Sequence, residues 1–260
     1  MDLKGESMEK REKKFLIAGI IFSVIMIVFS YVAITSDNGE KAEISKGSVQ
    51  YQETKSQISI GETINNKLEG SGIQRSKSGN IYSGNFKNGK KNGKGEYTYQ
   101  NGSTYKGTFE NSCFKNGELT LKDEQGVFEI QIKDGKIQGK VKAELTNGDS
   151  YKGNFVNGKF NGECEITYSD GDTYIGTVKD DLKSGEGTYQ WSETGDSYTG
   201  NWKGDKMNGK GTYYYSWNEY PYLKGDFSNN KPKGTCTYYK SKKTHFKTYW
   251  KKGTCVKAAY

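Results

Sequence analysis

A glycine-rich segment from Gly84 to Lys91, GNFKNGKK, is the part of the sequence that most resembles a site for chemistry. It satisfies all but the last position of G-x-x-x-x-G-K-[ST], the sequence pattern of the phosphate-binding loop, whose backbone N–H groups hold nucleotide phosphates. Lys91 stands where that loop needs the Ser or Thr that holds Mg²⁺, and no strand-loop-helix pattern surrounds the segment. Similar segments recur from Gly153 to Phe160 and from Gly204 to Gly211. Since a nucleotide site is not expected to recur along a chain, we predict a repeated structural unit here.

Other side chains for catalysis or metal binding are few. His245 is the sole histidine, so a multi-histidine metal site is excluded and a histidine-based triad has one candidate base. Acidic residues are scattered over positions where strands would face solvent, and the segment from Ser169 to Thr173, SDGDT, suits a turn better than a calcium loop. We therefore predict that the protein is not an enzyme and holds no cofactor and no metal.

The elements that would position any site are repeats, because the spacing around Tyr82 returns about every 23 residues. A full copy has an aromatic residue at position 0, Gly at +2, an aromatic residue at +4, and Gly near +7 and at +11 and +13. Copies begin at Tyr82, Tyr105, Phe128, Tyr151, Tyr174, Tyr198 and Leu223, with partial copies near Ser59 and at Phe246. The copies that begin at Tyr105 and Phe128 depart most from the pattern.

Each copy has the features of a β-hairpin. Asn-Gly pairs, the strongest short hairpin signal, are predicted to form turns within and between copies. They occur at 88–89, 92–93, 101–102, 116–117, 147–148, 157–158, 161–162 and 208–209. Strand alternation places Tyr82, Gly84 and Phe86 on one face, and glycines at +2, +11 and +13 are predicted to lie beneath rings.

We therefore predict an all-β repeat array, an elongated, twisted, single-layer antiparallel sheet of successive β-hairpins. With 34 Gly and 20 Tyr among 260 residues, its burial would come mainly from aromatic rings. The ring face is predicted to form a shallow aromatic groove. Its candidate residues are Tyr82, Phe86, Tyr105, Phe109, Tyr151, Phe155, Tyr174, Tyr198, Trp202 and Phe227.

This pattern, YxGxF/WxxGxxxGxG at a 23-residue period, resembles the membrane occupation and recognition nexus (MORN) repeat family over some seven copies. The resemblance implies an extended β-hairpin sheet that acts in scaffolding, self-association or membrane-proximal recognition. It also implies that any catalysis belongs to a partner domain, and no such domain is recognised in this sequence.

The N-terminal part of the chain predicts a membrane anchor. Residues 15–35 are apolar and uncharged over about 20 residues, enough for one transmembrane helix, and a cleaved signal peptide is the alternative. Basic residues in the segment 1–14 place the N-terminus in the cytoplasm. Residues 36–57 are polar and predict a flexible stalk, so the repeat domain, 58–260, would stand outside the cytoplasm on a single-pass cell-membrane protein.

Four cysteines are present, and an extracytoplasmic location would permit disulfides. Cys164 and Cys236 hold the same repeat position three copies apart, ~29 Å, whereas a disulfide needs Cα atoms within ~7 Å. Cys236 and Cys255 lie in adjacent copies but not on adjacent strands. Together with Cys113, these are therefore predicted to be mostly free packing residues.

Positive charge gathers at the C-terminus. The chain carries +8, and residues 227–260 hold nine lysines and no Asp or Glu. One interpretation is that these lysines keep a terminal edge strand soluble and unpaired. The other is a site for an anionic lipid headgroup or an acidic envelope polymer. Its candidate residues are Lys240, Lys242, Lys243, Lys247, Tyr249, Trp250, Lys251 and Lys252.

Two functions follow. The first is a membrane-tethered, non-catalytic scaffold whose groove binds a protein partner or another copy of the chain. The alternative is a binding module for an anionic envelope ligand, which uses the C-terminal lysines and aromatic residues. An extracytoplasmic location disfavours nucleic acid as the partner.

Overall fold

The computed structural model describes residues 49–259, in which the chain is all-β with nineteen strands. It comprises two compact units. The N-terminal unit holds residues 49–146 and Phe155–Gly158, and the C-terminal unit holds Asn147–Asn154 and residues 159–259. None of the described residues form a helix that could cross a membrane. The predicted basic segment 1–14 and transmembrane helix 15–35 lie outside the described residues.

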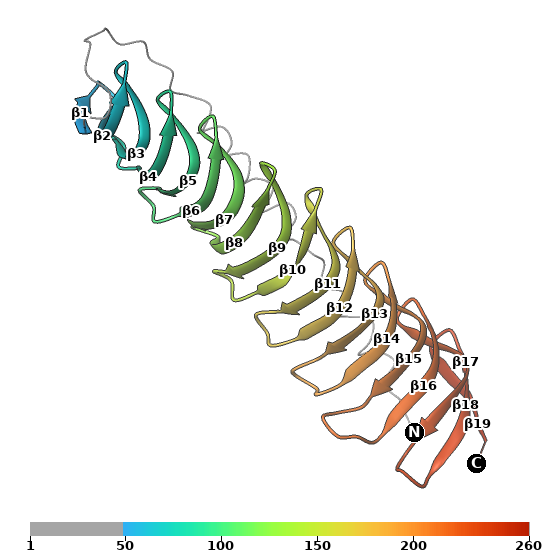
Figure 1. Ribbon diagram of the computed structural model, residues 1–260. Coiled ribbons are helices and arrows are strands. Elements are labelled where there is room, and N and C mark those ends of the chain that lie inside the picture. Colours follow the sequence, from blue (N-terminus) through green and yellow to red (C-terminus); the bar gives the residue numbers. More distant parts are fainter. Residues whose placement is uncertain (1–48, 260) are drawn as a thin grey trace. The chain divides into compact units, whose positions relative to one another are not determined.

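In the N-terminal unit each strand pairs antiparallel with the next (Figure 1). These strands are β1 (Val49–Glu53), β2 (Gln57–Ile64), β3 (Lys67–Ser76), β4 (Ile81–Lys87), β5 (Lys90–Thr98), β6 (Thr104–Glu110), β7 (Cys113–Asp123), β8 (Gly126–Lys133) and β9 (Lys136–Leu145). Strand β10 (Ser150–Val156) is divided between the two units.

The C-terminal unit repeats this antiparallel arrangement from β11 onward. Its strands are β11 (Lys159–Thr167), β12 (Thr173–Lys179), β13 (Leu182–Gln190), β14 (Ser197–Lys203), β15 (Lys206–Tyr214), β16 (Tyr222–Ser228), β17 (Lys231–Tyr239), β18 (His245–Lys251) and β19 (Thr254–Ala259). The hairpin architecture predicted from the repeats is confirmed.

The ends of the repeat region are more complete than predicted. Part of the predicted stalk is a strand, because β1 pairs with β2 and places Tyr51 opposite Ile60. The alternation of Val49 and Tyr51 with glutamines is a strand pattern that the polar composition of this segment concealed. The two predicted partial copies are whole hairpins, β2–β3 and β18–β19.

Half of the Asn-Gly pairs lie in turns or loops, as predicted. At 88–89 and 157–158 both residues have positive φ, 52° and 77° in the first pair and 53° and 83° in the second. This is the geometry that lets a two-residue turn follow the twist of the flanking strands. The pairs at 101–102 and 147–148 lie in loops between hairpins.

The other four Asn-Gly pairs lie inside strands β5, β7, β11 and β15, so the prediction of turns there is wrong. In three of them the glycine has positive φ, as in Gly93 at 90°. Between the pairs Gly84↔Gly95 and Phe86↔Lys91, three residues of β5 face one residue of β4, which is a β-bulge. Gly93 therefore serves the backbone of a bulge. Its predicted place beneath a ring is also wrong, because an added Cβ would meet Asn85 at 3.4 Å instead.

The glycines at +2 and +13 do lie beneath rings. Gly84 and Gly95 face each other on adjacent strands; a Cβ on Gly95 would collide with the Tyr82 ring, and one on Gly84 with the Tyr82 hydroxyl and the backbone of Gly95. The Tyr82 hydroxyl then donates a hydrogen bond of 2.8 Å to the carbonyl of Asn85, the residue at the bulge. The tyrosine hydroxyl makes the same bond in three other copies, those of Tyr105, Tyr174 and Tyr198.

These glycines form a continuous row in each unit. In the N-terminal unit the row is Gly61, Gly72, Gly84, Gly95, Gly107 and Gly117. In the C-terminal unit it is Gly176, Gly187, Gly200, Gly211 and Gly225. The strands of both units are strongly curved (Figure 1), and a curved layer can enclose its ring face, which a flat layer would expose to water.

Short polar side chains tie each hairpin to the next. The Asp196 carboxylate accepts a hydrogen bond of 2.8 Å from the N–H of Ser216 and one of 2.7 Å from the Tyr213 hydroxyl. In other copies the same place, two residues before the first tyrosine, accepts an N–H from a residue 19 or 20 positions further along the chain, in or next to the following loop. The acceptors are Asn80, Ser103, Asp149 and Asp172.

Candidate functional site

The ten rings predicted to line a groove form the core. Each is at most 5% exposed, so the prediction of an accessible aromatic groove is corrected. They are Tyr82, Phe86, Tyr105, Phe109, Tyr151, Phe155, Tyr174, Tyr198, Trp202 and Phe227. The physical reason is that the glycine row leaves room for the rings to lie against the curved sheet, where rings of successive copies pack edge to face. Trp202, for example, lies 5.6 Å from Tyr174 and 5.3 Å from Tyr198, centroid to centroid, at nearly perpendicular angles.

The ring face also holds two lysine side chains, Lys183 and Lys91, that the sequence analysis did not single out. Lys183 is 3% exposed, and its ammonium lies within 6 Å of four ring centroids, those of Tyr168, Tyr174, Tyr189 and Trp202. Lys91 occupies the same place in its copy, over Tyr82 and Tyr97, and burial lowers its pKa. The burial of these lysines could have been predicted from their position in the repeat, because Phe114, Phe160 and Met207 occupy the same position in other copies and are buried. Lys183 is therefore closed to a ligand, and Lys91 is half-buried among its rings.

The predicted anionic-ligand residues are exposed, with one exception. Tyr249 is 49% exposed and shares the polar face of β18 with Lys247 and Lys251. Lys240, Lys242 and Lys243 lie exposed in the β17–β18 loop, and Lys252 in the β18–β19 turn. Trp250 is 4% exposed, and its Nε1–H donates a hydrogen bond of 2.8 Å to the Thr248 hydroxyl. It alternates to the ring face, so it belongs to the core.

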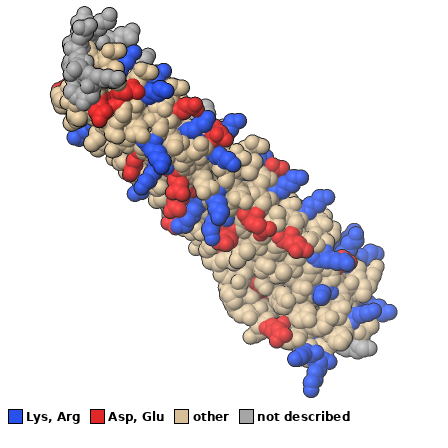
Figure 2. Space-filling view, viewed as in Figure 1, with Lys and Arg blue, Asp and Glu red and all other residues tan. Residues whose placement is uncertain are grey.

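Lysine side chains stand out from the last strands in Figure 2. On this polar face the structure adds a row of stacked rings that the sequence did not suggest. Tyr214, Tyr222, Tyr239 and His245 face one another on β15–β18. Successive ring centroids are 5.3, 4.4 and 5.2 Å apart, and the last two pairs are stacked. We call these four residues the ring row.

A second row runs beside the ring row, two residues from it toward the middle of each strand. It consists of Thr212, Lys224, Thr237 and Lys247, which face one another in that order. We call it the threonine–lysine row. Both lysines are exposed, and hydroxyl and ammonium groups alternate from strand to strand. The next position inward carries Asp226, opposite Lys210 and Lys233.

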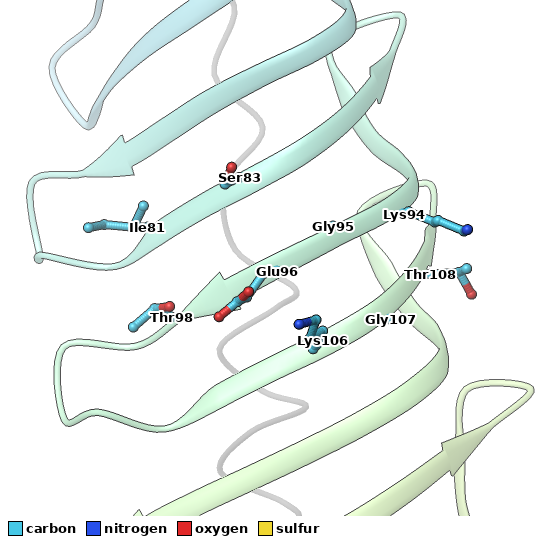
Figure 3. Close-up of a pocket in the computed structure, with 9 residues that line it drawn as sticks. All are labelled: Ile81, Ser83, Lys94, Gly95, Glu96, Thr98, Lys106, Gly107 and Thr108. Carbon is cyan, nitrogen blue, oxygen red and sulfur yellow. The ribbon is translucent and has the colours of Figure 1, made fainter.

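The N-terminal unit has a hollow of about 600 Å³ on the polar face of β4–β6 (Figure 3). Gly95 and Gly107 face each other in its lining, where neither strand carries a side chain. Its other lining residues are Ile81, Ser83, Lys94, Glu96, Thr98, Lys106 and Thr108. Glu96 stands opposite Lys106 across the strand pair, so one of the two lysines in the lining faces a carboxylate.

The same face carries exposed apolar side chains on the neighbouring strands. Tyr51, Ile60 and Ile73 face one another on β1–β3 and are 61%, 47% and 50% exposed. Soluble surfaces commonly show apolar residues singly, whereas three in a row form a patch that a partner could cover.

The described residues offer no group of three or more His, Cys, Asp or Glu placed to hold a metal ion. The phosphate-loop-like segment from Gly84 to Lys91 runs from β4 through its turn into β5, a hairpin that offers no helix N-terminus to a phosphate.

The structure joins none of the four cysteines in a disulfide. Burial raises the pKa of the Cys164 thiol to about 12, which keeps it protonated and unreactive at neutral pH.

Comparison with known protein families identifies five segments of the chain as MORN repeats, residues 82–104, 151–173, 174–193, 198–219 and 224–244. Together they cover less than half of the chain. The hairpins of β6–β9, although similar in structure, are not among them, which agrees with their departure from the pattern. No curated protein matches the chain. MORN repeats in general are non-catalytic modules that bind proteins or lipids.

Proposed function

We propose, from the five MORN repeats and the exposed lysines of the last strands, that this chain is a membrane-tethered, non-catalytic binding module for an anionic ligand of the cell envelope. The observation that carries the proposal is the charge of the C-terminal hairpins, where nine lysines and no carboxylate side chain fall in residues 227–260. Clustered lysines contribute ~1 kcal/mol each near an anionic surface.

Tethering is the second part of the proposal. It rests on the apolar segment 15–35 and the basic residues before it, which favour a single-pass cell-membrane protein with extracytoplasmic repeats. Protease added to intact cells tests this topology. Digestion of the repeats supports it, whereas their protection in intact cells and digestion only after lysis places them in the cytoplasm.

Ligand binding is tested with the full-length protein in nanodiscs of neutral phosphatidylcholine. The probes are polyglutamate, hyaluronan and vesicles that contain phosphatidylglycerol, each over a series of salt concentrations. We expect binding that weakens as salt rises, and a large loss when Lys240, Lys242, Lys243, Lys251 and Lys252 are changed to Gln. Binding that is indifferent to both salt and these substitutions would exclude the lysines as the site.

A protein scaffold is the second candidate, and the exposed row Tyr51, Ile60 and Ile73 favours it. Such a surface would hold a protein partner or another copy of the chain by apolar contact, which survives high salt. Crosslinking in the native cell, followed by identification of the captured proteins, tests the scaffold function. The proteins captured by the wild-type chain are compared with those captured by the Ile60→Ser/Ile73→Ser variant. A capture pattern unchanged by this pair of substitutions would argue against the apolar row.

A further inference from the structure

We propose that the polar face of β15–β18 is a binding strip for a linear acidic polysaccharide, which lies across the strands. The strip consists of the threonine–lysine row and the ring row beside it. The proposal rests on the anionic-ligand function proposed above and names the chemistry of the ligand. It also moves the centre of the site from the terminal loops to a rigid sheet surface.

The alternation of groups along the threonine–lysine row carries the argument. Thr212, Lys224, Thr237 and Lys247 stand on successive strands, ~4.8 Å apart, so the strands that carry the two lysines are about 10 Å apart, with a threonine between them. A polysaccharide with carboxylates on alternate sugars presents anions separated by hydroxyl groups. The row therefore matches such a chain in both charge and hydrogen bonding.

The acidic side chains nearby do not lie opposite the lysines of the threonine–lysine row. Asp226 lies outside the row, opposite Lys210 and Lys233. Glu219 lies beside Tyr220, at the margin of the ring row, where its carboxylate raises the pKa of that tyrosine after the larger effect of burial. The lysines of the row thus face no carboxylate in register.

The ring row disfavours nucleic acid as the ligand. Bases bind proteins by stacking on uncovered ring faces. Here Tyr239 is stacked between Tyr222 at 4.4 Å and His245 at 5.2 Å, so both of its faces are occupied. The rings instead stiffen the surface and add hydroxyl and imidazole hydrogen-bonding groups at its edge.

A bilayer is disfavoured by the make-up of the threonine–lysine row, which offers no large apolar side chain for insertion among the acyl chains. Anionic lipid would respond to total charge and not to the order of groups. That difference separates the two ligands experimentally.

The experiment measures binding of a fluorescent hyaluronan decasaccharide to the full-length protein in phosphatidylcholine nanodiscs, at about 0.15 M NaCl. We expect Lys224→Gln/Lys247→Gln to weaken binding about tenfold or more, since two charge-assisted hydrogen bonds are lost. The matched control is Lys210→Gln/Lys233→Gln, which removes the same charge from the same face and should change affinity less than about threefold. Lys224→Arg/Lys247→Arg should retain binding.

A second pair of variants tests the hydroxyl groups. Thr212→Val/Thr237→Val keeps the side-chain shape and the strand preference, and should weaken binding of hyaluronan but not of polyglutamate, which has no sugar hydroxyls. All these positions are exposed or half-buried, so thermal unfolding should be little changed.

Equal losses in the two Lys→Gln pairs would show diffuse charge and overturn the strip, while the proposed anionic-ligand function stands. Tighter binding of oligodeoxythymidine or phosphatidylglycerol vesicles than of hyaluronan would overturn the ligand class. Failure of the wild-type protein to bind any of the anionic probes would overturn the proposed function together with this inference.

Discussion

The Lys183 ammonium lies 5.1 Å from the centroid of the Tyr189 ring, inside the core of the C-terminal unit. Asp205 accompanies it, with a carboxylate oxygen 4.0 Å from the ammonium nitrogen. A cation in an aromatic core gains from the ring faces but loses its hydration, and the two effects largely offset each other.

We therefore expect Lys183→Met to change the free energy of unfolding by less than about 1.5 kcal/mol, because methionine fills a similar volume. In this variant the Asp205 carboxylate, which is 12% exposed, would keep its hydrogen bond from the backbone N–H of residue 183, so the charge would not be left without a partner. Lys183→Ala should cost ~2–4 kcal/mol, because it leaves a cavity among the rings. Urea denaturation followed by tryptophan fluorescence measures both. A Lys183→Met loss as large as that of Lys183→Ala would mean that the charge itself stabilises the core.

The tyrosine hydroxyl that meets the bulge gives a second test. Tyr198 donates a hydrogen bond of 3.1 Å to the Asn201 carbonyl, so Tyr198→Phe should destabilise the fold by about 1–2 kcal/mol through an unsatisfied carbonyl. Tyr249→Phe is the control, because that side chain is 49% exposed and should change stability by less than about 0.5 kcal/mol. Equal effects on the denaturation midpoint would remove any special role for the hydroxyl.

A third test concerns the glycine row. An added Cβ at Gly211 would collide with the Tyr198 ring, so Gly211→Ala should destabilise the protein by about 3 kcal/mol or more. Gly204 has a positive φ of 56° but nothing within 4 Å of its added Cβ. Gly204→Ala should therefore cost only about 1 kcal/mol, from backbone strain. Comparable losses in calorimetry would show that the ring contact at Gly211 costs no more than the backbone strain at Gly204.

Alkaline pH should unfold the protein. Burial raises the pKa of Tyr82 from 10.0 to about 12, against a smaller opposite effect of its hydrogen bond to Asn85. Burial also raises the pKa of Tyr174 and Tyr198. Because the folded state holds these protons more tightly, its stability is full below pH 10 and falls as the pH rises from 10 toward 12.

Circular dichroism and tyrosinate absorbance, recorded together, check this alkaline transition. The two signals should change at the same pH, because the buried tyrosines ionise only on unfolding. Tyrosine ionisation without loss of β-structure would contradict burial of the rings.

Lys91 acts in the opposite direction, since its pKa is lowered by burial and its desolvation cost is relieved as it loses its proton. Lys91→Met should therefore raise stability at neutral pH.

Much of the fold could be predicted because its signals are local. The alternation of Tyr82, Gly84 and Phe86 places them on one face of a strand whatever its neighbours are, and the 23-residue period repeats that choice. The same local signals were ambiguous for the Asn-Gly pairs. A left-handed Gly suits both a turn and a bulge, so only the partner strand decided that Gly93 lies in a bulge.

The candidate site was less accessible to sequence reasoning. The basic charge of the last copies is a matter of composition, and the exposure of Lys247 and Lys251 followed from alternation along β18. The lysines around Trp250 favoured a place for it in the ligand site, whereas its ring position in the copy that begins at Phe246 favoured the core, and the structure agrees with the second. The ring row could not be foreseen, because it depends on the register of four strands across the irregular segment that precedes Tyr222.

The sequence by itself determined the hairpin unit, the two faces of its strands and the concentration of lysine at the C-terminus, because each depends on neighbours within a few residues. The tertiary structure decided whether the ring face is open or closed. Glycines from successive copies face one another and leave room for the rings, so the curved sheet encloses the rings and leaves the opposite face exposed. Contacts between successive strands and copies thus turned a predicted groove into a core, and turned a set of scattered polar residues into an ordered surface.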